Sequence, residues 1–313
     1  MVNWWGLTFS LLTFIAGLHI MSSGFKLAAG QKLKDFLKLL TFNPLLGVFT
    51  GALVTLILQS SSITTVMVVG LVNTGLLNLK QGISIIVGAN IGTTVTGQIL
   101  SFSLIKSAYP LTALGGVILL LFRSRFKRLR GIGKGLIGLG MLFGGLDGMS
   151  LALKPLREST FILSLLIQAG EVPVKGILMG ALSTLFLQSS GAVMGIMLAL
   201  AMQGIVSLPA SISIILGADM GTCITSLIAS LGTNIHARRT ALAHLIFNII
   251  GAFCLLLIFD PFVTLIKIIS SELPRQVANA HTMYNLFNTL IIIPFINQFT
   301  RLVTYLIPNG RGY

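Results

Sequence analysis

Long apolar segments alternate with short polar ones along almost the whole chain. The segments at residues 4–24, 82–102 and 135–153 each have about the 20 residues that an α-helix needs to cross a bilayer. A shorter apolar segment at 109–122 is predicted to cross as well, and residues 154–172 are expected to form a nearly neutral loop. The pattern predicts an all-α polytopic membrane protein.

A polar group separates two apolar arms early in the chain. The arms are residues 44–58 and 63–79, and the group is Gln-Ser-Ser-Ser at 59–62. At 1.5 Å per residue the first arm is about 22 Å long, too short to cross. We predict a re-entrant helical hairpin with its tip near the bilayer midplane, and a continuous helix is the alternative. Hydrocarbon supplies no hydrogen-bond partners, so polar side chains at that depth need partners of their own.

The segment 44–101 returns later in the chain as residues 173–230. A shift of 129 residues aligns the two without a gap, and 25 of the 58 positions are identical. Three predicted crossings separate the two hairpins, an odd number, so the second copy is expected to be inverted. Basic residues gather in alternate loops, above all at 123–134, which places these loops in the cytoplasm and the N-terminus outside.

Each copy carries two motifs at the same spacing. The first is Gln-Ser-Ser, at 59–61 and 188–190, and the second is Gly-Ala-(Asn/Asp)-x-Gly-Thr, at 88–93 and 217–222. Paired glycines around an amide and hydroxyls can unwind a helix and expose its backbone. We therefore predict a broken transmembrane helix in each repeat, as in secondary transporters built from inverted repeats.

One transmembrane transporter domain is predicted for residues 1–313. Repeat 1 covers about residues 4–122, repeat 2 covers about 132–259, and C-terminal helices occupy about 260–313. The basic amphipathic segment 26–42 is expected to lie on the membrane surface.

The signature Ala-His-x-x-(Phe/Tyr)-Asn occurs twice in the C-terminal part of the chain. It places His244 and Asn248 on one helix, and His281 and Asn285 on another. We expect these four side chains to tie helices together rather than to bind a substrate.

Composition supports the membrane assignment and excludes other classes. Apolar residues make up 54% of the chain and charged residues 9%, and the mean hydropathy is +0.96, whereas soluble domains carry about 25% charged residues. The net charge of +14 lies in short loops, where it indicates topology rather than nucleic-acid binding. Cys223 and Cys254 lie in apolar segments and indicate neither a disulfide framework nor a metal cluster. A multi-pass protein of the inner cell membrane is expected.

The two hairpin tips offer groups for ions of both signs. The first arm of each ends in unpaired carbonyls, which suit a cation, and the second begins with free N–H groups and a positive dipole end, which suit an anion. Oxygen ligands without a Cys/His cluster fit an alkali cation better than a transition metal. The pattern predicts a small oxyanion bound together with cations. The oxygen-rich surface extends to Asn90, Thr93, Thr94, Asp219 and Thr222.

The doubled Gln-Ser-Ser motif, each copy followed by Gly-Ala-(Asn/Asp)-x-Gly-Thr, resembles the type II sodium/phosphate cotransporters and their bacterial relatives. The resemblance covers roughly residues 5–300. It implies sodium-coupled symport of inorganic phosphate by alternating access, with Na⁺ as coupling ion, no cofactor and no enzyme activity. The phosphate ligands it implies are Gln59, Ser60, Ser61, Ser62, Gln188, Ser189 and Ser190. The sodium ligands it implies are Gln59, Asn90, Thr93, Thr94, Gln188, Asp219 and Thr222.

Three features depart from the pattern of that family. Gly191 replaces the third serine of the second tip, and Asp219 stands where an amide is usual, so both bear on ion stoichiometry. The soluble regulatory domain that many bacterial relatives carry after the membrane part is not expected here.

Other functions remain open at this point. They are transport or export of another oxyanion such as arsenate or sulfate, an anion channel, and, more remotely, an intramembrane serine hydrolase that uses Ser189 or Ser190 with His244. The expected partners are inorganic phosphate, sodium ions and the lipid bilayer, without nucleic acid, and a homodimer is left open.

Overall fold

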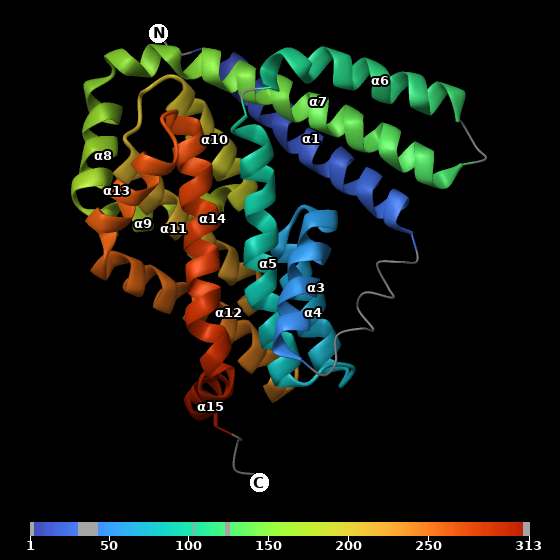
Figure 1. The fold of residues 1–313 in the computed structure, drawn as a ribbon, viewed down its shortest axis with the longest axis vertical. Coiled ribbons are helices and arrows are strands. Elements are labelled where there is room, and N and C mark those ends of the chain that lie inside the picture. The colour runs from blue at the N-terminus through green and yellow to red at the C-terminus, as the bar shows by residue number, and fades with distance from the viewer. Residues whose placement is uncertain (1–2, 31–42, 103, 123–125, 309–313) are drawn as a thin grey trace.

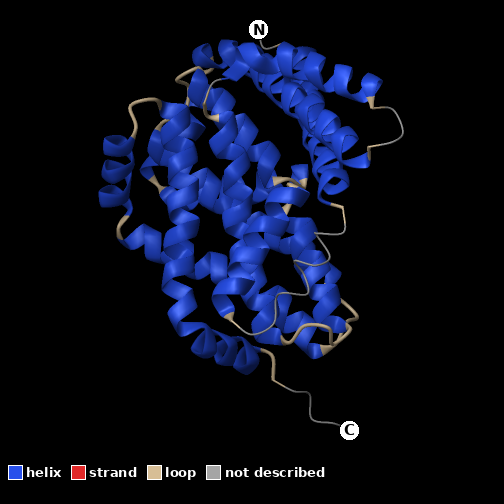
Figure 2. Cartoon of the chain, turned by 45° about the vertical axis from the view of Figure 1, so that its right-hand side comes forward, coloured by secondary structure: helices blue, strands red, loops and turns tan. Residues whose placement is uncertain are grey.

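The computed structural model describes residues 3–30, 43–102, 104–122 and 126–308. Every regular element in these ranges is a helix, which confirms the all-α prediction (Figure 2). Six of these helices are long and apolar enough to cross a membrane, or seven if one bent pair counts as a single span. Most of the predicted surface segment 26–42 lies outside the described residues.

The α-helices follow one another with short connections (Figure 1). In chain order they are α1 Trp4–Ala29, α3 Pro44–Leu58, α4 Ser61–Asn73, α5 Leu79–Leu100, α6 Ala108–Leu121, α7 Lys127–Leu153, α8 Thr160–Glu171, α9 Pro173–Leu187, α10 Ser190–Met202, α11 Leu208–Ala229, α12 Ile235–Leu257, α13 Phe259–Ile269, α14 Leu273–Ile292 and α15 Ile296–Leu306. Figure 1 shows α1, α6 and α7 side by side in a slanting layer at the top. The body below this layer contains α3, α4, α5, α12 and α14.

The duplication is visible in the helix boundaries. Each boundary of α3, α4 and α5 recurs 129 residues later in α9, α10 and α11. The chain breaks at the same place in both copies, because α3 ends just before Gln59 and α9 just before Gln188, and each of these glutamines has the left-handed αL conformation.

The chain doubles back at the first break. The Thr55 hydroxyl of α3 donates to the Thr64 hydroxyl of α4 over 2.9 Å, whereas residues nine apart in one straight helix are about 13 Å apart. The alternative of a continuous helix through residues 59–62 is therefore wrong. In addition, the Ser22 hydroxyl of α1 donates to the Leu58 carbonyl at 2.6 Å, which fastens this tip to the upper layer.

The prediction of a broken transmembrane helix in each repeat is wrong, because α5 and α11 are continuous α-helices through both glycine motifs. Their glycines serve close helix packing instead of unwinding. A Cβ atom on Gly88 would lie 1.9 Å from the Val48 carbonyl oxygen of α3, and one on Gly217 would lie 1.8 Å from the Ile177 carbonyl oxygen of α9. The backbones approach so closely that only hydrogen fits between them.

The loop predicted at 154–172 is also mostly helical. After a short 3₁₀ turn, α8 begins where the Ser159 hydroxyl accepts from the Ile162 amide. The buried side chains of α8 are Leu166 and Ala169, and α8 meets α9 at an angle of 118°. The apolar stretch at 161–167 favours a helix even though it is too short to cross the bilayer.

Close packing through glycine gives a direct test of the fold. Gly180→Ala is expected to lower the thermal unfolding midpoint of the protein in detergent, because the new Cβ would lie 1.8 Å from the Ile214 carbonyl oxygen. Overpacking of this kind costs about 1–3 kcal/mol or more. Gly70→Ala in α4 is the matched control, since a Cβ there meets nothing within 4 Å. Equal midpoints for both variants would contradict this account of the α9–α11 contact.

Candidate functional site

The two tips meet around one small polar cavity. It has a volume of about 40 Å³, and since roughly 10–15 Å³ holds one water, it has room for a small ion or a few waters. Its lining comprises Leu18, Gln59, Ser60, Ser61, Ser62, Thr93, Thr96, Gln188, Ser189, Ser190 and Gly191. All seven residues predicted to bind the oxyanion therefore lie at one place, although 129 residues separate the two motifs.

The backbone of each tip is held in an uncommon conformation. Gln59 has φ 53° and Gln188 has φ 50°, and they are the only non-glycine residues with positive φ in the described ranges. Such a conformation costs about 1–3 kcal/mol and persists where the surroundings enforce it. The turn lets Ser60 and Ser189 cap the next helices, because their hydroxyls accept from the amides of Ile63 at 3.2 Å and Ala192 at 3.1 Å.

The helix ends around the cavity set its electrostatics. α4 begins at Ser61 and α10 begins at Ser190, so two helix N-termini with their free N–H groups line the cavity. This arrangement suits an anion. The carbonyl ends of α3 and α9 lie directly beside these N-termini and offer oxygens to a cation.

The two glutamine side chains are held differently. The Gln59 amide donates to the Leu56 carbonyl at 2.5 Å, and its oxygen accepts from the Thr96 hydroxyl of α5. Gln188 is exposed, and its side chain makes no hydrogen bond with the described residues. Gln59 is thus fixed by the protein, whereas the Gln188 amide is available to a ligand.

A second small cavity adjoins Gln188 on the side of α11. It has a volume of about 50 Å³, and its oxygen-bearing lining residues are Ser62, Thr184, Gln188, Thr222 and Thr225. The Thr184 hydroxyl is 2% exposed and has no hydrogen-bond partner among the described residues. An unpaired buried hydroxyl costs about 1–3 kcal/mol, so its oxygen favours a ligand here.

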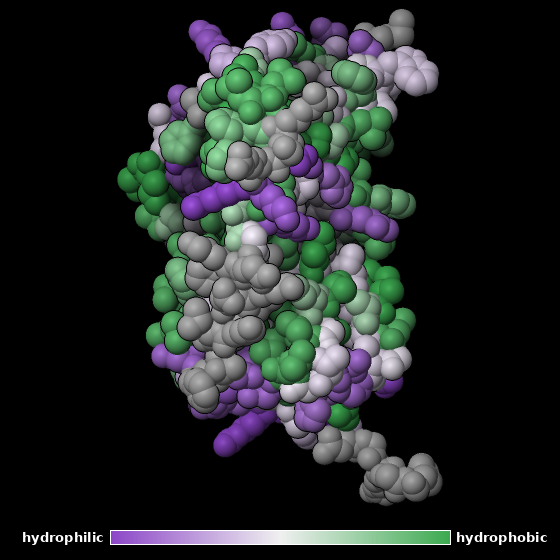
Figure 3. Space-filling view, turned by 90° about the vertical axis from the view of Figure 1, so that its right-hand side faces the viewer, coloured by the Kyte–Doolittle hydropathy of each residue, from purple (hydrophilic) through white to green (hydrophobic). Residues whose placement is uncertain are grey.

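A larger crevice leads from the tips toward α1. It has a volume of about 460 Å³, and α1 contributes His19, Ser22, Ser23 and Lys26 to its wall. Figure 3 shows a hydrophilic band across the middle of one side of the molecule, between two largely apolar areas. His19 and Lys26 are not among the site residues predicted from the sequence, although their spacing of seven residues places them on one helix face.

The predicted sodium ligands divide into two groups. Gln59, Thr93 and Gln188 line the first cavity, and Gln188 and Thr222 line the second. Asn90, Thr94 and Asp219 line neither of these cavities. The Thr94 hydroxyl donates to the Ile91 carbonyl of its own helix at 2.8 Å.

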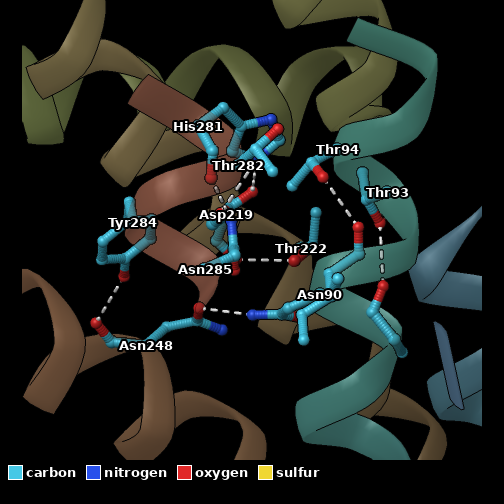
Figure 4. A network of polar contacts seen from close by, with 12 residues as sticks. Asn90, Thr93, Thr94, Asp219, Thr222, Asn248, His281, Thr282, Tyr284 and Asn285 are labelled. Atoms are coloured by element: carbon cyan, nitrogen blue, oxygen red, sulfur yellow. Dashed lines mark hydrogen bonds and ion pairs between the residues drawn. The ribbon is translucent and has the colours of Figure 1, made fainter. Parts of the chain in front are cut away.

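Asn90 and Asp219 belong to a buried polar network between helices (Figure 4). The Asp219 carboxylate lies 3.2 Å from His281 Nε2 and accepts from Asn285 Nδ2 at 3.0 Å. Its counterpart in the first repeat, Asn90, donates to Asn248 Oδ1 at 2.7 Å and lies 3.3 Å from His244 Nε2.

The network confirms the expectation that the two His-x-x-x-Asn pairs tie helices together. α12 holds α5 and α14 holds α11, each through one histidine and one asparagine. The Tyr284 hydroxyl, which donates to the Asn248 carbonyl at 3.3 Å, joins the two halves.

The structure does not bring together the pair that the serine hydrolase alternative requires, His244 with Ser189 or Ser190. His244 is fully buried, with Nε2 against Asn90 and Nδ1 3.4 Å from the Ser226 hydroxyl. Both ring nitrogens thus face groups other than Ser189 or Ser190, so His244 cannot act as the base that a serine nucleophile requires.

The fold and the cavity define a multi-pass membrane protein with a polar site enclosed by a duplicated pair of helices. The chain belongs to the Na⁺/Pi-cotransporter family, a family of transporters, and the match covers residues 13–151 and 158–270. The resemblance inferred from the two motifs is thereby confirmed.

Several curated proteins are similar over most of this chain. The uncharacterized protein YqeW of Bacillus subtilis is 30% identical over 95% of this chain and 96% of its own length. YjbB of Escherichia coli, named as a candidate inorganic phosphate export protein, is 29% identical over 91% of this chain and 52% of its own. The chain thus spans about half the length of the YjbB relatives.

The sodium-dependent phosphate transport protein 2A of Ovis aries is similar over a shorter stretch. It is 43% identical over 93 residues, which are 29% of this chain and 15% of that protein. No solved structure matches the chain. The family and these relatives support phosphate transport.

Proposed function

We propose that this protein is a sodium-coupled symporter of inorganic phosphate. The observation that carries the proposal is the cavity between the tips, where the seven polar residues of the two tips and two helix N-termini converge. Two opposing N-termini place partial positive charge on both sides of an anion without a fixed cation, which favours binding and release within one cycle.

Phosphate binds between the tips in this proposal. Hydroxyls of Ser61 and Ser190 and the unbound amide of Gln188 donate to its oxygens, together with the first N–H groups of α4 and α10. Lys26 in the crevice wall raises the local concentration of the anion on its way to the tips.

Sodium binds beside phosphate at the ends of the arms. The second cavity offers the oxygens of Thr184, Thr222 and Gln188, which are hard ligands that suit an alkali cation. Thr93 contributes to the first cavity. Asn90, Thr94 and Asp219 hold the helices in place, because their side chains are bonded within the protein.

The proposal includes an arrangement of these elements in the membrane. The two hairpins are re-entrant from opposite sides of the inner membrane, and the two repeats are inverted. Rocking of one group of helices against the other exposes the tips alternately, and the crevice along α1 is the path on one side.

A second candidate function is export of phosphate from the cell through the same site. The name of the YjbB relatives favours it. A symporter runs in either direction, according to the sodium and phosphate gradients, so one site serves both.

Radiolabelled phosphate uptake into liposomes that hold the purified protein tests the proposal. With an inward sodium gradient, phosphate is expected to accumulate above equilibrium, whereas an equal potassium gradient is expected to give no accumulation. Equilibration that is independent of sodium would indicate an anion channel, and accumulation of sulfate in place of phosphate would indicate another oxyanion transporter.

A further inference from the structure

A large cavity lies where α4 turns into α5 and α12 begins. These helix ends are at the lower end of the molecule in Figure 1. It has a volume of about 560 Å³, and its lining comprises Val72, Gly75, Leu77, Asn78, Leu79, Lys80, Asn234, His236, Arg239 and Thr304. α4 has 13 residues, so about 20 Å of helix separate the first tip from this cavity. The cavity is thus distinct from the site between the tips.

The ionisable residues that line this cavity are all of the basic types. Lys80, His236 and Arg239 line it, and no acidic residue is among the described residues that do. Arg239 is only 3% exposed, and its Nε donates to the Ile307 carbonyl at 2.9 Å, which fixes the guanidinium in the wall.

Two helices begin at the cavity and add to its positive potential. α5 starts after Asn78 and α12 starts after Asn234, and both asparagines line the cavity as N-caps. Their side chains accept from the third N–H of each helix, whereas the earlier N–H groups have no helical acceptor. The positive ends of both helix dipoles therefore meet here.

The start of α12 is fastened to the end of α4, the helix that precedes α5. The Asn234 amide donates to Asn73 Oδ1, and Asn234 Nδ2 donates to the Asn73 carbonyl, both at 2.8 Å. The cavity is consequently a fixed feature of the fold. Val72, Leu77 and Leu79 give it an apolar side next to the basic one.

We propose that this cavity binds a phosphoryl anion, either the headgroup of an anionic phospholipid or inorganic phosphate. Basic pockets between transmembrane helices bind phosphorylated headgroups, and the apolar side suits the first carbons of acyl chains. A bound phosphoryl group would bridge α5, α12 and the α15 side of the cavity, far from the tips.

Binding of a fluorescent short-chain phosphatidic acid to the purified protein in uncharged detergent tests the proposal. Saturable binding is expected, with little binding of the matching phosphatidylcholine. Lys80→Gln is expected to weaken it about fivefold, since one basic residue contributes about 1 kcal/mol to such an interaction. Arg238→Gln is the matched control, because Arg238 is exposed and does not line the cavity.

A second variant tests the cavity without removing a charge. Thr304→Trp places a large side chain in the cavity and is expected to abolish saturable binding. Displacement of the lipid by inorganic phosphate would identify free phosphate as a ligand too, and failure of phosphate to displace it would assign the site to lipid. Gln188→Ala should leave both results unchanged, which separates this site from the proposed transport site.

Three results would overturn the proposal. They are a lack of saturable binding, equal weakening by Lys80→Gln and Arg238→Gln, and unchanged binding in a folded Thr304→Trp variant.

Discussion

Gln188→Ala is expected to abolish sodium-driven phosphate uptake while the protein stays folded. The Gln188 amide is exposed at the tip and makes no hydrogen bond with the described residues, so its removal costs the fold little. A hydrogen bond to a charged ligand contributes about 1.5–3 kcal/mol, so uptake should fall at least about tenfold. The measurement is initial uptake in liposomes, with size-exclusion chromatography as the test of folding.

Gln59→Ala is expected to lose uptake as well, for a partly different reason. The Gln59 amide connects the Leu56 carbonyl to Thr96 of α5, so the variant also loosens the first tip and should unfold at a lower temperature. Gln168→Ala is the matched control, because Gln168 lies on α8 and contacts the Lys175 ammonium at 2.8 Å. Unchanged phosphate uptake in both Gln59→Ala and Gln188→Ala would contradict the assignment of the transport site to the tips.

The break between the arms could be predicted because the same Gln-Ser-Ser group occurs twice in the sequence. A Gln-Ser-Ser group inside an apolar stretch is unfavourable in a continuous helix, and its return after 129 residues shows that the break is specific. The structure places both breaks at those glutamines and brings the seven polar residues to one cavity.

The helices after the tips could not be predicted in the same way, because glycine has two uses. Gly88 and Gly217 could unwind a helix or let another helix approach. The choice depends on the backbones of α3 and α9, which lie against them, and no local pattern in α5 or α11 reveals this contact.

The residues of α1 that line the crevice could not be predicted from the sequence for a similar reason. His19 and Lys26 lie on one face of α1 by their spacing, but what that face meets depends on where the tips are fastened. The bond from Ser22 to the Leu58 carbonyl joins residues 36 positions apart, and such a long-range contact has no sequence signature.

Asp219→Leu is expected to destabilise the protein strongly. Asp219 is 6% exposed and lies against His281 and Asn285, so the leucine removes the carboxylate that both buried side chains contact. Breaking a buried pair of this kind costs about 3–5 kcal/mol. The loss should appear as a lower thermal unfolding midpoint in detergent and a lower yield of monodisperse protein.

Asp219→Asn is the matched variant, because it recreates the first repeat, where Asn90 lies 3.3 Å from His244. It should retain most of the stability, since an amide oxygen can still accept from His281 or Asn285. Because the Asp219 carboxylate faces His281 and Asn285 rather than the cavities, half-maximal uptake should occur within about twofold of the wild-type sodium concentration. A folded Asp219→Asn protein that needs about tenfold more sodium would contradict this expectation. It would indicate that Asp219 is a sodium ligand and that His281 contacts the carboxylate when no sodium is bound.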